Sequence, residues 1–386
     1  MIQTSFGYLT LLFFITSTIL YITAQSKAKL FNYLPAIVII YFLVMVLSSL
    51  EVWTKTDEIN STYKAFKSNL LPAMIFLMLL QADIRNIFKL GKKVILTFFL
   101  ASFSISLGFI ITFTLLHSYF DADAWGTFGA LSGSWMGGTG NMIAIQSALN
   151  IPDSAMGNVL LIDSIDYAIW VMILLTLVPF ANRFNQWSGA SNALLEQIDK
   201  TTDQEKESTA LSFETLFLVL SLSLVVSFLT QGIASYFPHS DFFSATTWTV
   251  ILATILGVLG SFTPLHNMKS SAVMGNLFLY IIVALIASRA NFGELTQAPL
   301  YIVSGFMIIA IHATIMVLFA KLFKIDLFAL GVASLANIGG VASAPILAGA
   351  YHKALIPIGV LMAMIGYIIG TFTGLGVTKV LKLIGG

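Results

Sequence analysis

The chain has 386 residues, of which 58% are hydrophobic and only 10% are charged, and its formal net charge is +1. Soluble domains carry about 25% charged residues, so this composition excludes an ordinary soluble protein. The near-neutral charge and the lack of a basic tract disfavour a nucleic-acid partner, and the absence of cysteine excludes disulfides and thiolate metal sites. The sequence therefore predicts an all-α polytopic membrane protein, with the lipid bilayer as a partner.

Apolar runs near the length that a bilayer demands of a helix, about 20 residues, recur from end to end. We expect spans at about residues 5–24, 31–50, 69–83, 93–119, 156–180, 211–237, 245–263, 272–289, 298–320 and 355–378. Lys27 and Lys29 follow the first run and no basic residue precedes it, which indicates a retained span and not a signal peptide. The polar stretch 182–210 predicts a flexible cytoplasmic linker between a first membrane repeat, 1–181, and a second, 211–386.

Two glycine-rich stretches interrupt the apolar pattern and match each other. Gly-Ala-Leu-Ser at 129–132, followed by Gly-Gly at 137–138, recurs as Gly-Val-Ala-Ser at 331–334, followed by Gly-Gly at 339–340. Backbone that leaves the helical form at membrane depth must be buried in protein or line a wet cavity. We therefore expect one interrupted or re-entrant helix in each repeat.

The distribution of positive charge predicts that the two repeats are inverted. If each glycine-rich stretch enters and leaves the membrane on one side, most basic residues fall on the cytoplasmic side, and each repeat has five spans. An odd number of spans inverts the second repeat. Matched segments that begin at Ala82 and Ala290 support the same division. Exceptions to the charge rule are Lys55, Lys64 and Lys67, in the loop after the second span, and Lys379 and Lys382 at the end.

Inverted repeats with interrupted helices are typical of secondary transporters, in which the interruptions meet near the bilayer midplane. The glycines allow a close approach of backbone to a ligand, and freed amides at a half-helix N-terminus favour an anion. Close helix packing by small residues is the alternative. The candidate solute-binding residues are Ser134, Gly137, Gly138, Thr139, Asn141, Asn337, Gly339, Gly340 and Ser343.

Two carboxylates, Asp163 and Asp166, fall inside the predicted span 156–180 and share a helix face because they are three residues apart. A buried carboxylate needs a cation, a proton or several donors, and this span contains no Lys or Arg. We expect both to bind the coupling ion, Na⁺ or H⁺, together with Thr139 and Asn141, and to be metal ligands if the ion is Na⁺. A structural pair capped by neighbouring helices is the alternative. His312, inside another span, is interpreted as a core histidine, with a proton relay as the alternative.

These features favour cation-coupled symport of a small organic solute, preferably an anion, by alternating access, with no cofactor besides the coupling ion. One alternative is a Na⁺/H⁺ antiporter without an organic solute. Another is a membrane scaffold or sensor that does not transport, in which Asp166→Asn would leave function intact. An enzyme is disfavoured, because two aspartates on one helix face cannot bracket a scissile bond and the sequence lacks the Gly-x-Gly-Asp and His-Glu-x-x-His motifs.

The stretch 133–142, the following Asp163, and the stretch 334–340 with Ala344-Pro345 resemble a bacterial membrane family, the domain-of-unknown-function 819 family. The resemblance covers nearly the whole chain. That family is distantly similar to the glutamate:sodium symporters, the 2-hydroxycarboxylate transporters and the bile acid:sodium symporters. The resemblance implies a scaffold and a transport domain, two inverted five-span repeats, Na⁺ or H⁺ coupling, a homodimer and a location in the bacterial inner membrane. The lack of an evident arginine within a span disfavours a dicarboxylate such as glutamate.

Overall fold

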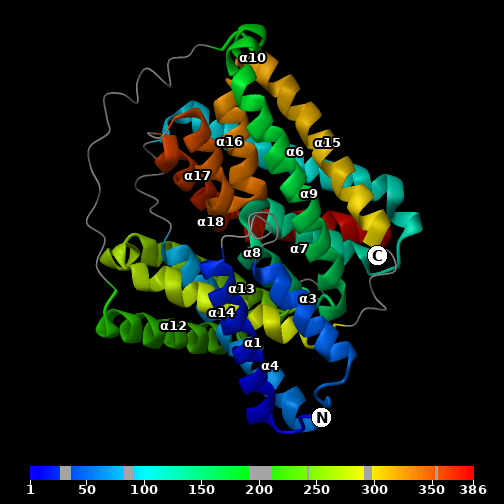
Figure 1. Cartoon of the computed structure of the whole chain (residues 1–386), viewed down its shortest axis with the longest axis vertical. Coiled ribbons are helices and arrows are strands. Elements are labelled where there is room, and N and C mark those ends of the chain that lie inside the picture. The colour runs from blue at the N-terminus through cyan, green and yellow to red at the C-terminus, as the bar shows by residue number, and fades with distance from the viewer. Residues whose placement is uncertain (27–35, 82–89, 191–210, 241–242, 291–297, 353–354) are drawn as a thin grey trace.

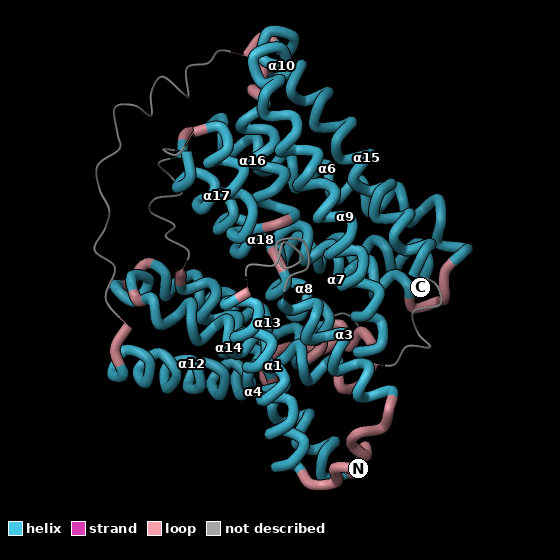
Figure 2. Tube along the Cα trace, in the orientation of Figure 1, coloured by secondary structure: helices cyan, strands magenta, loops and turns pink. Residues whose placement is uncertain are grey.

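The structure, a computed structural model, describes residues 1–26, 36–81, 90–190, 211–240, 243–290, 298–352 and 355–386. Regular structure in these residues is helical, and the strand pairing is limited to one isolated bridge between Ile2 and Trp53 (Figure 2). The all-α prediction is confirmed. Lys27, Lys29 and most of the matched segments that begin at Ala82 and Ala290 lie outside the described residues.

Seven of the described helices are long and apolar enough to cross a membrane, which confirms the polytopic membrane class. They are α1 (Ser5–Gln25), α6 (Lys92–Leu116), α9 (Met156–Leu177), α12 (Phe213–Ala234), α14 (Lys269–Ala287), α15 (Ala298–Phe323) and α18 (Ile356–Gly385). The expected spans 31–50, 69–83 and 245–263 correspond to α3 (Ala36–Ser49), α4 (Asp57–Leu80) and α13 (Ala245–Ser261). These three helices are shorter or more polar than the seven.

Helix α4 begins well before the expected residue 69 because local capping signals start it in a polar region. The side chain of Thr56 accepts a hydrogen bond from the Ile59 N–H at 3.2 Å and so caps the helix. Asp57 and Glu58 in the first turn interact favourably with the helix dipole. The apolar second half of α4 is buried. Its polar first half, which carries Lys64 and Lys67, precedes this apolar segment.

The segment that we expected to be a flexible linker from residue 182 onward begins instead with a helix, α10 (Ala181–Ser188). Gly189 ends this helix with a left-handed φ of 74°. The Asn185 side chain accepts a hydrogen bond at 2.9 Å from the backbone N–H of Leu327, the first residue of α16 (Leu327–Ile338). A tertiary partner that is distant in sequence therefore orders the start of the linker, and residues 191–210 lie outside the described part.

The helices separate into two bundles (Figure 1). The lateral bundle consists of α1, α3, α4, α12, α13 and α14, and its helix α4 packs against the last three of these. The hairpin bundle consists of α6, α9, α10, α15 and α18 together with four short helices, α7 (Ala124–Gly137), α8 (Thr139–Ala148), α16 and α17 (Gly340–Tyr351). Each half of the chain contributes three helices to the lateral bundle, and then a helix, a pair of short helices and a further helix to the hairpin bundle.

Contacts between the two bundles are concentrated on a few elements. Helix α8 packs against α4 and α13, and α9 packs against α3 and α14. Helices within either bundle contact one another far more extensively. The bundle interface is thus formed mainly by one arm of the first glycine-rich segment and by the helix that carries the two aspartates.

Candidate functional site

The first glycine-rich stretch is a helical hairpin, formed by α7 and α8, that turns at Gly138. This residue has φ 87° and ψ 174°, a conformation open essentially to glycine alone. The two arms pack closely: a Cβ on Gly133 of α7 would lie 2.4 Å from Cδ1 of Ile145 on α8. The base closes in the same way, with Gly126 beside Ile151. The chain therefore doubles back instead of continuing as a broken straight helix.

The second glycine-rich stretch forms a similar hairpin from α16 and α17. It turns at Gly339 and Gly340, and Gly340 has a φ of 58°. The arms approach where a Cβ on Gly331 would lie 3.2 Å from Cδ2 of Leu347. Pro345 lies inside α17. The interrupted helix that the sequence predicts for each half is confirmed.

The turns of the two hairpins meet on one helix, α18. A Cβ on Gly366 would lie 3.1 Å from the Met136 carbonyl oxygen in the first hairpin and 3.4 Å from the Ala336 carbonyl oxygen in the second. The neighbouring Tyr367 ring approaches both turns, since it lies 3.3 Å from the Cβ position of Gly138 and 3.9 Å from that of Gly340. The glycines that the sequence singles out thus converge beside one aromatic ring.

The first carboxylate of α9, Asp163, is bound to the first hairpin. Its Oδ2 accepts a hydrogen bond from Ser134 Oγ at 3.0 Å, and its Oδ1 accepts one from Trp135 Nε1 at 3.0 Å. Both donors lie in the last turn of α7, next to the break at Gly138. The expected partners, Thr139 and Asn141, follow the break, and Asn141 is hydrogen-bonded to Thr371 and to the Gly137 carbonyl instead of to an aspartate.

The second carboxylate, Asp166, has no polar partner in the described part of the chain. Its side chain is fully buried, and neither carboxylate oxygen has a hydrogen-bond donor there. It packs instead against α15, where a Cβ on Gly305 would lie 1.7 Å from Oδ2 of Asp166. Only a glycine at 305 leaves room for this carboxylate, so the two aspartates have different surroundings although they share one helix face.

The next two turns of α9 contact the second hairpin. The Tyr167 ring lies against Gly339 and is 2.4 Å from the Cβ position of that glycine. One turn further on, Trp170 Nε1 donates to Ser334 Oγ at 2.8 Å. Helix α9 therefore binds the first hairpin through Asp163 and the second through Tyr167 and Trp170, with Asp166 between them.

His312 of α15 is a satisfied core histidine, as the sequence suggests. Its Nε2 lies 2.8 Å from Ser334 Oγ, and its Nδ1 lies 2.7 Å from Ser104 Oγ on α6. Because Trp170 donates to Ser334, the Ser334 hydroxyl is free to donate to Nε2, which leaves Nδ1 as the protonated nitrogen. This buried chain of hydrogen bonds fixes the second hairpin to α6, α9 and α15.

We expect Ser334→Ala to destabilise the protein clearly, because it leaves the Trp170 N–H and the His312 Nε2 buried without a partner. Each unsatisfied buried group costs about 1–3 kcal/mol. Ser223→Ala is the matched control, since Ser223 is also fully buried but donates only to the Leu220 carbonyl of its own helix. Thermal unfolding in detergent checks the prediction, and equal losses in the two variants would contradict it.

The two asparagines of the predicted site fasten the hairpins to neighbouring helices. Asn141 Oδ1 accepts from Thr371 of α18 at 2.5 Å, and its amide donates to the Gly137 carbonyl at 2.7 Å. Asn337 Oδ1 accepts from Ser102 of α6 at 2.6 Å. Sequence reasoning missed Thr371 and Ser102, because an isolated hydroxyl in an apolar span has no local signal.

The remaining predicted residues lie close to the two turns. Thr139 is the first residue of α8, directly after Gly138. Ser343 is buried in the first turns of α17, with its Oγ 2.0 Å from the Cβ position of Gly339. Within the described residues there is no group of three or more His, Asp, Glu or Cys side chains able to hold a metal ion, so a cation here would depend on single carboxylates with hydroxyl and carbonyl oxygens.

The fold and this site define a polytopic α-helical membrane protein with two glycine hairpins that meet beside a helix carrying two aspartates, of which Asp166 is fully buried. The sequence profile of one family, "Protein of unknown function (DUF819)", matches residues 10–384. The chain therefore belongs to the DUF819 family. It is also similar to the Uncharacterized membrane protein YjcL of Bacillus subtilis (strain 168), with 25% identity over 339 residues and 82% of each chain covered.

Proposed function

We propose that the protein is a secondary active transporter that couples a cation, Na⁺ or H⁺, to the symport of a small organic anion by alternating access. The observation that carries this proposal is Asp166, a fully buried carboxylate with no hydrogen-bond donor among the described residues. A charge buried in this way is costly unless a counter-ion or a proton compensates it. An ionisable group inside a membrane span therefore suggests an ion pathway.

The different surroundings of the two aspartates support a division of roles. Asp163 is occupied by Ser134 and Trp135, so it connects α9 to the first hairpin. Asp166, one turn further along, remains available to a cation. Binding of that cation would neutralise the carboxylate between the two hairpins. In this proposal Asp166 binds the coupling ion, and Asp163 couples the binding of that ion to the first hairpin.

The convergence of the two turns supports an anionic solute. Helix α8 begins at Thr139 and α17 begins at Gly340, so both N-termini lie at the turns beside Tyr367. The first N–H groups of a helix lack partners within the helix, and the dipole adds about half a positive charge at this end. Two such ends at one place favour a small carboxylate and require no arginine.

The separation of the helices into two bundles supports the transport step. We propose that the hairpin bundle, with ion and solute bound, moves against the lateral bundle. Limited contacts between the bundles make this a feasible rigid-body motion. The proposal includes inverted repeats, a homodimer and a bacterial inner-membrane location, and it assigns no enzymatic step to the protein.

The test is the thermal stability of purified protein in detergent, titrated with NaCl or with choline chloride. An ion that binds only the folded state stabilises it by RT ln(1 + [L]/Kd), about 2.7 kcal/mol at one hundred times Kd. We expect a sodium-specific rise in wild type and in the exposed-loop control Asp121→Asn, and no rise in Asp166→Asn. Without sodium, Asp166→Asn should be at least as stable as wild type, because it removes an uncompensated buried charge.

The same titration separates the alternatives. A response to pH in place of sodium, present in wild type and lost in Asp166→Asn, would assign the coupling to H⁺. The proposal would be contradicted if neither sodium nor pH changed the stability in a way that requires Asp166. A large loss of stability in Asp166→Asn under all conditions would also contradict it. Either result would favour a structural aspartate. A sodium response without any response to organic anions would favour the Na⁺/H⁺ antiporter.

A further inference from the structure

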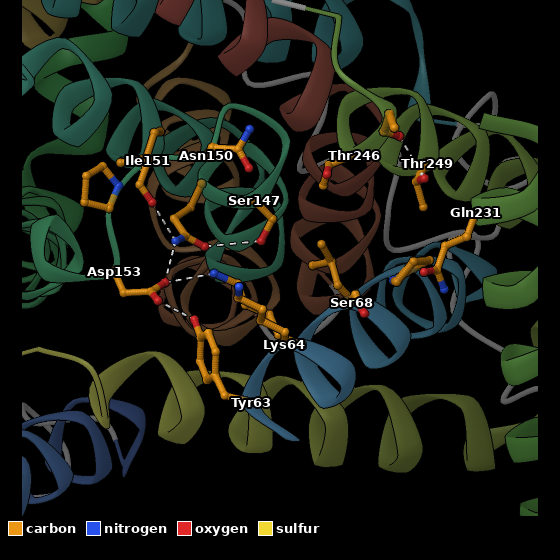
Figure 3. Close-up of a pocket in the computed structure, with 16 residues that line it drawn as sticks. Tyr63, Lys64, Ser68, Ser147, Asn150, Ile151, Asp153, Gln231, Thr246 and Thr249 are labelled. Carbon is orange, nitrogen blue, oxygen red and sulfur yellow. Dashed lines mark hydrogen bonds and ion pairs between the residues drawn. The ribbon is translucent and has the colours of Figure 1, made fainter. Parts of the chain in front are cut away.

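A cavity lined by charged side chains lies away from the hairpin turns, at the edge of the bundle interface. A pocket of about 520 Å³ lies between α4, α12 and α13 of the lateral bundle and the base of the first hairpin (Figure 3). Its volume falls within the range of small-molecule sites, about 300–1,000 Å³. Lys64 and Lys67, two exceptions to the charge rule of the sequence, both line it.

The charges in this pocket leave one cation without a partner. Asp153 is the carboxylate of the lining, and it is already occupied: it accepts from Lys67 Nζ at 2.8 Å, from Gln146 Nε2 at 2.7 Å and from the Tyr63 hydroxyl. Lys64 is exposed and forms no ion pair with a described residue. The pocket therefore has one surplus positive charge.

An adjoining cavity does not change this balance. It shares Tyr63, Lys64 and Asp153 with the first pocket and adds Arg289 and Asp57, one charge of each sign. The walls of the first pocket combine hydroxyl and amide groups with apolar surface, namely Ser68, Gln231, Thr246, Leu71, Pro72 and Ile151. A monovalent anion with an apolar body complements both the charge and this mixed surface.

The position of the pocket connects it to the hairpin turns. Helices α4 and α8 pack together along a seam. At one end of the seam, Lys67 and Gln146 line the pocket. At the other end, beside the first turn, a Cβ on Gly140 would lie 2.6 Å from Sδ of Met78. The eleven residues from Lys67 to Met78 correspond to about 16 Å along a helix. The pocket therefore lies at one end of this seam between the bundles, and the predicted solute site lies at the other.

We propose that this pocket is a second small-molecule site, which takes up a monocarboxylate with an apolar body through Lys64 and Lys67 before the anion reaches the hairpin turns. The identification of that anion with the transported solute rests on the proposed function. The carboxylate competes with Asp153 for Lys67. Asp153 lies in the short 3-10 helix Asp153–Ala155, which connects α8 to α9 of the hairpin bundle, whereas Lys67 belongs to the lateral bundle. Uptake of the anion therefore weakens an ion pair between the two bundles.

The absence of cysteine from the chain allows a direct test, because a single introduced thiol is unique. Ser68→Cys places it in the pocket, and Ser235→Cys places one at the exposed C-cap of α12, outside the lining. The measurement is the rate of maleimide alkylation in detergent with benzoate, acetate, inorganic phosphate or chloride, as choline salts at matched ionic strength. We expect benzoate to slow alkylation of Ser68→Cys saturably and to leave Ser235→Cys unchanged.

Charge variants then locate the contact. Lys64→Gln in the Ser68→Cys protein should raise the benzoate concentration for half-protection about tenfold, the effect of losing one charged hydrogen bond. Lys269→Gln, the same change at an exposed lysine that does not line the pocket, should leave it unchanged. Absence of protection, equal protection by phosphate, or insensitivity to Lys64→Gln would each overturn the proposal.

The assay also separates this inference from the transport proposal. The buffers contain no sodium, and the measurement is repeated with Asp166→Asn. Protection that persists in this variant supports the pocket site even if the sodium titration fails. A sodium response that depends on Asp166, combined with unprotected Ser68→Cys, would overturn the pocket site and leave the coupling site intact.

Discussion

Gly370→Val is expected to destabilise the protein strongly and to abolish any activity that depends on the first hairpin. A Cβ on Gly370 would lie 2.6 Å from Asn141 Nδ2, 2.7 Å from the Gly137 Cα and 3.0 Å from the Gly137 N. Two of these atoms are backbone, so no side-chain rotation relieves the clash. Overpacking of this kind costs about 1–3 kcal/mol, and here it also displaces the hydrogen bond between Asn141 and Thr371.

Helix α18 provides a matched control for this prediction. Gly376 lies on the same helix, and a Cβ there meets no heavy atom within 4 Å. Gly376→Val introduces the same side chain and the same change in helix propensity, but without a clash. Apparent unfolding temperatures in detergent should fall well below wild type for Gly370→Val and stay near it for Gly376→Val. Similar temperatures for the two variants would contradict the close packing of α18 against the first hairpin.

Gly138→Ala is expected to have a comparable effect through backbone conformation. The φ of 87° and ψ of 174° at this residue place it in a region that side chains bearing a Cβ rarely adopt, at a cost of about 1–3 kcal/mol. A Cβ there would also lie 3.3 Å from the Tyr367 ring. The variant must either bear this strain or open the turn, and both outcomes displace Thr139 and the N-terminus of α8. Thermal unfolding and the sodium titration described above measure the two consequences.

The change in stability expected for Gly232→Ala, the control for this substitution, has the opposite sign. Gly232 lies in helix α12 near its end, and a Cβ there meets no atom within 4 Å. Alanine is favoured over glycine in a helix by up to about 1 kcal/mol. This variant should therefore be as stable as wild type or slightly more stable. A loss of stability in Gly232→Ala equal to that in Gly138→Ala would show that the φ of Gly138 is not the cause.

The sequence predicts the helices and their interruptions because both depend on local composition. Apolar runs of sufficient length identify α6, α9 and α15, and the Gly-Gly pairs identify the turns at Gly138 and Gly340. The hairpin form is harder to predict from the sequence, because it depends on glycines such as Gly133 that let the two arms pack closely. The polar first half of α4 and the helix α10 were missed, since a capping residue in one and a distant backbone N–H in the other stabilise them.

The partners of the site residues could not be predicted, because they depend on elements far apart in the sequence. Asn141 was expected beside the aspartates, but the turn at Gly138 directs it to Thr371, 230 residues away. The spacing of Asp163 and Asp166 predicts a pair on one helix face. The structure separates them, since Asp163 meets the end of α7 and Asp166 meets Gly305 of α15. Spacing predicts a shared face, whereas the neighbouring helices decide what each residue contacts.

The dependence of both hairpins on α18 has a consequence for biosynthesis. Gly366 and Gly370 both contact the first turn, which is made much earlier, and α18 is the last helix of this sequence. Translation proceeds at about 5–20 residues per second, so the 230 residues between Asn141 and Thr371 correspond to about 10–50 s. During that time the first hairpin has neither its packing partner nor the Thr371 hydroxyl. A chain that terminates before α18 leaves both turns exposed, a defect that membrane proteases and chaperones can recognise.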